Sequence, residues 1–138
     1  MSEIYIHGNV SSSKNSKQWT GKYLINGKTT REYIKNTKTE YREGKETFKE
    51  LVKGLPLPYH ISFYFIRSTR RKFDYINPAQ TVQDLMVKNF WIEDDDITNI
   101  VPYFHGYEVD KEKAGVIIKV LKPEEYEPFQ GHSPNKTT

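Results

Sequence analysis

The segment Tyr59-His-Ile-Ser-Phe-Tyr-Phe-Ile66 constrains the fold more than any other stretch of the chain. It is rich in aromatic and β-branched residues, which is typical of a β-strand, and it is the strongest strand signal in the sequence. The whole chain has 138 residues. That length fits one domain, because two domains would each lie near the lower limit at which a stable core can be buried.

Two kinds of element are indicated before this strand. Residues 3–7 alternate apolar and polar side chains, as a half-buried strand does. Residues 8–27 are loop-like, with a stretch rich in serine, lysine and asparagine at their centre. A long helix is predicted to begin at a cap formed by Thr29 or Thr30 and to end near Lys53, where glycine and proline follow.

The chain after residue 66 predicts a second helix and two more strands. Asn77 is a natural N-cap, Pro78 suits the first helical position, and the helix is expected to end near Asn89. Residues 97–104 and 115–121 have the composition of strands joined by a polar turn. The order β-α-β-α-β-β predicts one α+β domain, in which a small mixed or antiparallel sheet packs with two helices.

Composition excludes several classes of protein. With 36% hydrophobic and 14% aromatic residues, the chain has enough apolar material to fold. It has no cysteine, which excludes a disulfide scaffold, a thiolate zinc site and a cysteine nucleophile. No run of 18 apolar residues and no secretory signal are visible. We expect a soluble, cytoplasmic domain over residues 1–122, followed by a polar, disordered tail over residues 123–138.

The net charge of +3 hides an asymmetry between the two halves of the chain. Residues 1–72 carry 15 Lys+Arg and 6 Asp+Glu, a balance of 15 − 6 = +9. Residues 73–138 carry 6 and 12, a balance of 6 − 12 = −6. A basic half attracts polyanions, and clustered carboxylates attract hard divalent cations. Charges on ordinary solvated faces are the alternative interpretation.

Acidic residues follow two of the predicted elements. Asp74 lies just beyond the aromatic strand, and Glu93-Asp-Asp-Asp96 lies on the connection into the next strand. If the strand that starts near Ile97 pairs beside the end of residues 59–66, Asp74 and Asp94 can share a Mg²⁺. Mg²⁺ prefers one or two carboxylates plus waters and phosphate oxygens. Taken alone, however, the acidic run favours a solvated turn.

Two stretches, Arg70-Arg-Lys-Phe-Asp-Tyr-Ile-Asn-Pro-Ala-Gln-Thr-Val-Gln-Asp-Leu85 and Phe90-Trp-Ile-Glu-Asp-Asp95, resemble the RusA family of Holliday junction resolvases. That family carries basic residues before D-x-D-N-x-x-K, an aspartate further along the same helix, and a [W/I]-x-D-D turn beyond it. Residues 7–17 are similar to the serine- and asparagine-rich loop after the family's first strand. The match covers most of residues 4–121 and looks closest to phage and prophage members.

The resemblance implies a homodimeric endodeoxyribonuclease of the bacterial cytoplasm, encoded by a phage or prophage in its closest members. Such enzymes bind four-way DNA junctions and resolve them by paired symmetric nicks in recombination and repair. They use Mg²⁺ or Mn²⁺ held by acidic residues, and metal-assisted hydrolysis leaves 5′ phosphate and 3′ hydroxyl ends.

Carried over by position, Asp74 matches the first aspartate of the motif, Asn77 its asparagine, Asp84 the later helical aspartate, and Asp94 the second acid of the turn. The implied metal ligands are Asp74, Asp94 and Asp95, and the implied catalytic residues are these three with Asn77. The secondary candidates are Asp84, Gln80, Glu93 and Asp96.

Two positions depart from the family pattern. Ile76 stands where the family has its second aspartate, and Gln80 stands where it has lysine. Isoleucine cannot coordinate a metal, and glutamine cannot supply the lysine's positive charge. Either the extra acids after Trp91 compensate, or the protein binds branched DNA without cutting it. A protein-interaction module that presents the acidic run to a basic partner is a third hypothesis.

The candidate contacts to DNA phosphates are Lys14, Asn15, Lys17, Arg70, Arg71 and Lys72. Their alternative interpretation is a pair of solubilising loops. Phe90 and Trp91 are expected to be core residues, and Trp19 is the better candidate for base stacking. Strands 59–66 and 116–121 are both candidates for a dimer surface.

Overall fold

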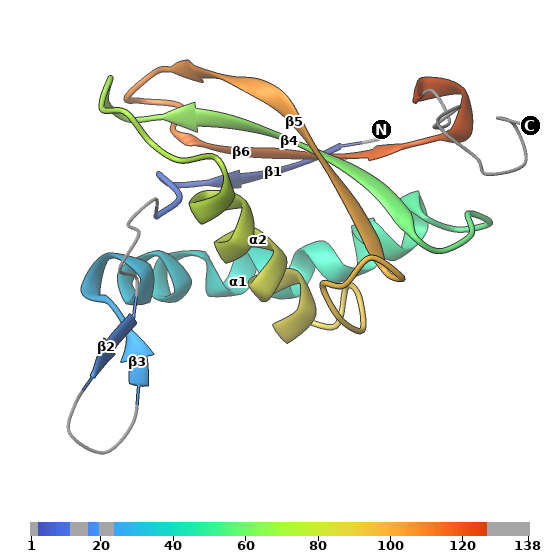
Figure 1. The fold of residues 1–138 in the computed structure, drawn as a ribbon, viewed down its shortest axis with the longest axis horizontal. Helices are drawn as coiled ribbons and strands as arrows, with labels where there is room; N and C mark the ends of the chain where they lie inside the picture. Colours follow the sequence, from blue (N-terminus) through green and yellow to red (C-terminus); the bar gives the residue numbers. More distant parts are fainter. Residues whose placement is uncertain (1–2, 12–16, 20–23, 127–138) are drawn as a thin grey trace, which may run out of the picture.

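The computed structural model describes residues 3–11, 17–19 and 24–126. Four strands form one sheet, and both helices lie on the same side of it (Figure 1). The order of these main elements is β-α-β-α-β-β, which confirms the α+β fold predicted from the sequence. No helix in the described part of the chain is long and apolar enough to cross a membrane.

The sheet places β1 (Glu3–His7), β6 (Gly115–Leu121), β4 (Tyr59–Arg67) and β5 (Ile100–Val109) side by side in that order. β6 runs antiparallel to both β1 and β4, whereas β4 and β5 are parallel. β4 and β6, the two strands considered as dimer surfaces, are therefore interior strands. The free edges of this sheet are β1 and β5.

The parallel pair fixes where the connections on either side of α2 (Ile76–Lys88) lie. Tyr59 pairs with Ile100, and Arg67 pairs with Val109. The start of β5 therefore lies beside the start of β4, so the condition stated for a Mg²⁺ shared by Asp74 and Asp94 is not met. The reason is the helical crossover, which returns the chain to the level at which the first strand began.

Both helices begin without a side-chain cap. α1 (Lys28–Leu51) starts after Gly27, and the predicted cap Thr30 instead donates a buried hydrogen bond from Oγ1 to Ser11 Oγ (2.9 Å). α2 starts at Ile76, so the prediction that Asn77 is the N-cap is wrong. Pro78 is the third residue of α2, where a backbone N–H has no partner within the helix and its loss costs little.

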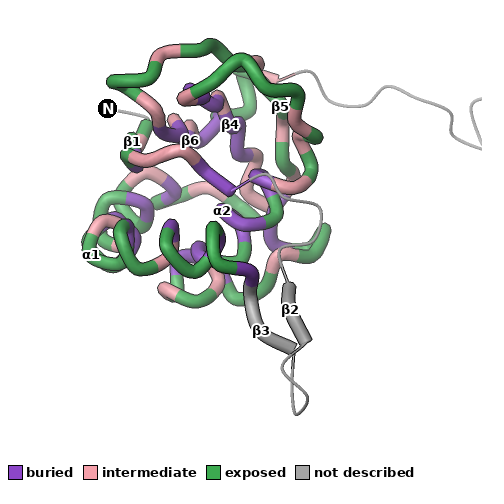
Figure 2. Tube along the Cα trace, turned by 90° about the vertical axis from the view of Figure 1, so that its left-hand side faces the viewer, coloured by how far each residue is buried: buried purple, intermediate pink, exposed green. Residues whose placement is uncertain are grey.

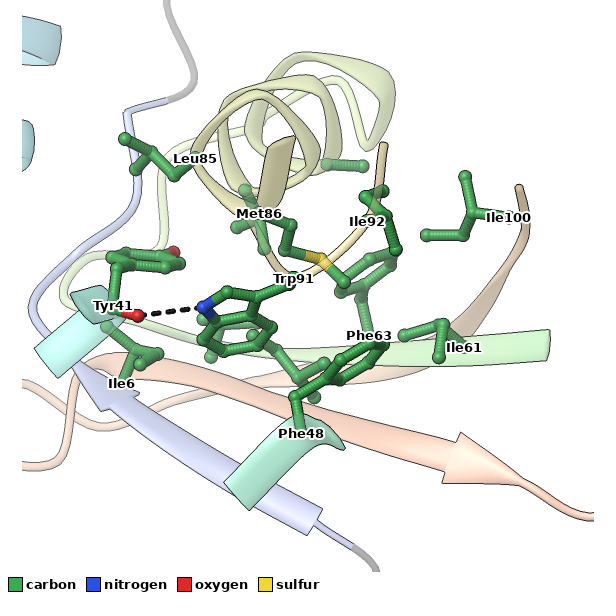
Figure 3. Packing of buried hydrophobic residues seen from close by; sticks show 14 of the residues in the cluster. Ile6, Tyr41, Phe48, Ile61, Phe63, Leu85, Met86, Trp91, Ile92 and Ile100 are labelled. Atoms are coloured by element: carbon green, nitrogen blue, oxygen red, sulfur yellow. Dashed lines mark hydrogen bonds between the residues drawn. The ribbon is translucent and has the colours of Figure 1, made fainter. Parts of the chain in front are cut away.

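Trp91 lies fully buried between α1 and the sheet (Figure 3). Its ring stacks on Phe48 with centroids 5.2 Å apart, and its Nε1 donates to the carbonyl oxygen of Tyr41 (2.7 Å). Gly44 leaves the space that the indole fills, because a Cβ there would lie 2.5 Å from the ring. Phe90 is 72% exposed with φ 64°, so the expectation that it is a core residue is wrong.

The chain differs from expectation in two further places. The region predicted as a loop contains β2 (Lys17–Trp19) and β3 (Leu24–Asn26), an antiparallel pair that projects away from the sheet (Figure 1). Residues 123–126, which the sequence assigns to the tail, pack on the sheet: the Tyr126 ring stacks on His60 with centroids 3.8 Å apart. Residues 127–138 lie outside the described residues.

The centre of the sheet is more deeply buried than its β5 edge. The central strands β4 and β6 are mostly buried, whereas β5 is mostly intermediate or exposed after Ile100 (Figure 2). Phe104 and Tyr107 of β5 are 51% and 54% exposed. An edge strand with open aromatic rings is therefore available on the side where β4 leads into α2.

Candidate functional site

Three polar side chains converge where the acidic segment folds back against α2. The Nε2 atom of Gln80 donates to Asp84 Oδ1 (2.8 Å) and to Asp95 Oδ2 (2.9 Å). Gln80 and Asp84 lie one turn apart on the exposed side of α2, and Asp95 reaches them from the connection between α2 and β5. The structure thus brings Asp95 and two of the secondary candidates together.

The other two aspartates of the acidic run bond within their own turn. Asp94 Oδ1 accepts the backbone N–H of Asp95 (2.8 Å). Asp96 Oδ1 accepts the hydroxyl of Thr98 (2.7 Å) and the side-chain amide of Asn99 (2.8 Å). These hydrogen bonds, with that from Thr98 the largest contribution, lower the pKa of the Asp96 carboxyl below its usual value. Asp96 therefore shapes the turn into β5.

Asp74 lies just before α2, where the spacing of Asn77, Gln80 and Asp84 along the helix extrapolates back to it; we call these four positions the polar stripe. The stripe runs Asp74, Asn77, Gln80, Asp84, at the three- and four-residue spacing of one helix face. Asp74 begins the first turn, because its carbonyl oxygen accepts the N–H of Asn77 (3.0 Å). Six residues separate Asp74 from Gln80, which is about 9 Å along the helix axis. The parallel pairing of β4 and β5 thus removes the premise on which a cation shared by Asp74 and Asp94 depended.

The carboxylates around Gln80 are ligands of the kind that Mg²⁺ uses, but Gln80 directs its Nε2 atom at both of them. Within the described residues, no three His, Cys, Asp or Glu side chains are grouped so as to hold a metal ion. Asp84 and Asp95 instead offer two carboxylates, and a rotated Gln80 amide would offer its Oε1 atom in place of Nε2. Mg²⁺ is commonly held by one or two carboxylates, with water and phosphate oxygens in its other positions.

A cleft of about 380 Å³ lies on the other side of Asp74, between the β4–α2 connection and β5. Its lining combines cations and aromatic rings: Arg70, Arg71, Lys72, Phe73, Tyr75, Phe104 and Tyr107. The rings of Tyr75 and Phe104 lie 4.4 Å apart, and those of Phe73 and Tyr107 lie 5.2 Å apart. Cations beside exposed rings are the groups that bind phosphates and stack on unpaired bases.

Tyr75 has a polar atom in this cleft wall that the fold leaves unsatisfied. Its hydroxyl is buried and has no hydrogen-bond partner among the described residues, and burial raises its pKa to about 12. A buried hydroxyl without a partner carries a desolvation cost. The hydroxyl therefore keeps its proton at neutral pH.

Phe73, which lines the cleft, contacts a residue that is bonded to the N-terminal loop. Arg67 is buried, donates from Nη1 to the carbonyl oxygen of Val10 (2.7 Å), and lies 4.5 Å from the Phe73 ring centre. Asn9 Oδ1 accepts the backbone N–H of Ser68 (2.8 Å). The chain that leads toward the predicted contacts at Lys14, Asn15 and Lys17 therefore starts beside the cations of the β4–α2 connection.

Sequence reasoning found the three cations of the cleft but missed its aromatic wall. Phe104 and Tyr107 come to the cleft because the parallel register sets Phe63 opposite Phe104 and Phe65 opposite Tyr107. Phe104 and Tyr107 are about half exposed, and this exposure would have marked them as candidate ligand contacts. The sequence alone does not show which aromatic residues of a strand are exposed. Lys14 and Asn15 lie outside the described residues, and Lys17 begins β2.

No protein-family model matches this chain, and a search of curated proteins found none that matches it. The resemblance to the RusA family therefore stays a prediction that rests on the residues given above.

Proposed function

We propose that the protein is a divalent-metal-dependent endonuclease that binds branched double-stranded DNA and cuts four-way junctions by paired nicks. One observation carries the proposal: the segment that lines the cationic cleft leads directly into α2, on which Gln80 and Asp84 meet Asp95. Carboxylates repel DNA, so cations beside them are needed to hold a phosphate near the metal. Paired nicks need two such sites, which favours a homodimer.

The residues divide into three groups along α2. Arg70, Arg71 and Lys72 would hold the phosphate backbone, because their segment lines the cleft. Asp84 and Asp95, with Gln80, would hold Mg²⁺ or Mn²⁺. A bound cation supplies Lewis-acid activation of the attacking water and of the leaving oxygen.

Asp74 and Asn77 lie between these two groups on the stripe. The Asp74 carboxylate can accept a hydrogen bond from the attacking water, and the Asn77 amide can donate one to a phosphate oxygen. The two residues would thus orient the water and the phosphate relative to each other. Asp94, whose carboxylate bonds within its own turn, has a supporting role in this arrangement.

The test is cleavage of a labelled four-way junction and a matched duplex in Mg²⁺, Mn²⁺ or EDTA. Wild type should make paired nicks in the junction only when metal is present. Asp74→Asn and Asp95→Asn should each lower the rate on the order of 100-fold or more, because each removes a charge from the reacting site. Glu112→Gln, an exposed acid in the turn between β5 and β6, is the matched control and should cut like wild type.

Cleavage that persists in Asp74→Asn and Asp95→Asn would overturn the assignment of these residues. No cleavage by wild type in either metal, together with tight junction binding, would overturn the nuclease and leave a DNA-structure-binding protein. Neither binding nor cleavage at low salt would overturn both and favour a protein partner for the acidic segment.

The second candidate function is non-catalytic binding of branched DNA. It is favoured by the hydrogen bonds that the Gln80 side chain makes. Its amide donates to both carboxylates that would otherwise receive a cation. Ile76, at the position of the family's second aspartate, is 68% exposed and offers no ligand. Junction affinity that is the same in Mg²⁺ and in EDTA, without cutting, is the result that this candidate predicts.

A further inference from the structure

α1 separates its charges onto two exposed flanks. Six of its cations recur every three or four residues and share an arc of about 80° on the helix. They are Arg31, Lys35, Lys38, Arg42, Lys45 and Lys49. Its five glutamates fall on the other flank: Glu32, Glu40, Glu43, Glu46 and Glu50. A helix built only for solubility gains more by alternating the two signs, because like charges one turn apart destabilise it.

Contacts show which way each flank faces. Glu40, on the acidic flank, accepts the backbone N–H of His7 in β1 (2.9 Å). On the cationic flank, Lys49 Nζ donates to the carbonyl oxygen of Trp91 (3.1 Å), and Lys45 Nζ lies 5.6 Å from the Phe90 ring centre. Both of these partners follow α2 in the chain. The cationic flank therefore faces α2 and the connection after it.

A groove of about 520 Å³ separates this flank from α2. α1 supplies Arg31, Lys35 and Lys38, and α2 with its last turn supplies Lys88 and Asn89. The floor is apolar and comes from Ile34, Tyr41 and Leu85. Asp84, one turn before Lys88, accepts its hydrogen bond from Gln80 and is not among the lining residues. The lining thus has four cations and no carboxylate.

We propose that the cationic flank of α1, together with Lys88, is a second DNA-binding surface, which holds the phosphate backbone of a duplex arm. The proposal rests on DNA as the ligand of the proposed function, but it needs neither the cleft nor a metal. From Arg31 to Lys49 the flank is about 27 Å long. One strand of a duplex presents about eight phosphates over that length, so the six cations can each meet one.

Charge and shape favour DNA over two other polyanions. A lipid surface would require an exposed apolar face, and the apolar face of α1 is buried against the core through Tyr33, Tyr41 and Phe48. A small phosphate compound could occupy the groove alone, but the row of cations continues beyond the groove lining through Arg42, Lys45 and Lys49. A long, regularly spaced row of cations matches a ligand whose charges are also regularly spaced.

The test measures binding of a plain duplex in EDTA at several salt concentrations, so that cleavage plays no part. Lys35→Gln/Lys38→Gln/Lys88→Gln removes three cations of the groove. Its slope of log affinity against log salt should be smaller than that of wild type by roughly 2 to 3, since each lost phosphate contact contributes about 0.9. The control, Lys111→Gln/Lys113→Gln/Lys122→Gln, removes the same charge outside the flank and should keep the wild-type slope.

Equal slopes for the groove variant and wild type would overturn the proposal, as would an equal loss in the control. A competition assay gives a further check. If poly-glutamate displaces labelled duplex as effectively as unlabelled duplex does, the proposal is overturned in favour of an acidic protein partner. Thermal melting checks the fold: the groove variant should melt no lower than wild type, because like charges have been removed from α1. The two proposals can also be separated. If wild type binds duplex but cuts no junction, and the groove variant loses duplex binding, this binding surface is supported while the proposed nuclease function is overturned.

Discussion

The two ends of α2 carry the most charged segments near the candidate site, and they are built in opposite ways. Before the helix, Arg70, Arg71 and Lys72 line a cleft together with the half-exposed rings of Phe104 and Tyr107 on β5. After it, Asp94 and Asp96 bond within their own turn, beside the buried Trp91. The run of acids that is most conspicuous in the sequence is thus largely structural, whereas the cationic side chains before α2 are exposed beside the cleft.

The largest expected effect comes from removing the anchor of the acidic end. Trp91→Ala should lower the free energy of unfolding by about 3 to 5 kcal/mol, because it empties the centre of the core. It also leaves the Tyr41 carbonyl without its indole donor. Urea unfolding measures the loss. A loss below about 1 kcal/mol would mean that the acidic end does not depend on the core.

The cationic end should respond in binding and not in stability. Tyr107→Ala removes an exposed ring, so the free energy of unfolding should change little. If Tyr107 stacks on an unpaired base at a branch point, junction affinity should fall by about 1 to 3 kcal/mol. His105→Ala, an exposed residue on the same strand, is the control and should bind junctions like wild type. Equal losses for junction and plain duplex would contradict stacking at the branch.

Local sequence patterns predicted most of the helices and strands, but not how the strands pair. Strand alternation and helix periodicity are local signals, and they located β1, β4, β6 and both helices to within a few residues. The hairpin β2–β3 and the extension of β5 to Val109 were missed, because residues 105–109 and 17–26 lack a strong apolar pattern. Local patterns also cannot give the direction in which two strands pair, which here was parallel.

The candidate site depended on contacts between elements, which a local pattern does not carry. Asp95 was among the predicted ligands, but its contact with Gln80 needs residues 89–99 to fold back along α2. Burial of Trp91 fixes that path, and Gly44 makes room for it. The aromatic wall of the cleft likewise follows from the register of β5 on β4. Side chains can thus be nominated from sequence, whereas their convergence comes from the fold.

A smaller effect is expected from Asp96, whose hydrogen bonds within its turn should make the stability of the protein depend on pH. Because hydrogen bonds lower the pKa of Asp96 in the folded protein, its charge adds stability above the unfolded value of 3.8, and that stability is lost as the pH falls through the folded pKa. Asp96→Asn should therefore melt below wild type at pH 7, and the gap should close below pH 3.8. Melting curves from pH 7 to pH 2 measure it. A gap that is independent of pH would contradict this account.

The smallest effect is expected when isoleucine is replaced by aspartate at either end of α2, at Ile76 in its first turn or at Ile97 in the connection that follows it. Ile76 and Ile97 are exposed to nearly the same degree, 68% and 69%, so neither substitution empties the core. Ile76→Asp puts a carboxylate in the first turn of α2, where the helix dipole favours it by about 0.3 to 1 kcal/mol. Ile97→Asp instead extends a run of four acids and gains no such interaction. Ile76→Asp should therefore melt slightly above wild type, and Ile97→Asp should melt at or below it.

The same pair tests whether Ile76 limits the chemistry. The new carboxylate of Ile76→Asp would stand between Asp74 and Asn77, at the position where the resemblance implies an aspartate. Junction cleavage should then need less Mg²⁺ than in wild type, whereas Ile97→Asp should leave the Mg²⁺ requirement unchanged. If both variants shift the Mg²⁺ requirement equally, the effect is one of net charge, and the cationic and acidic ends of α2 are not distinct sites. If Ile76→Asp melts higher while its Mg²⁺ requirement is that of wild type, the start of α2 is a helix terminus only, and the metal depends on Asp84 and Asp95 alone.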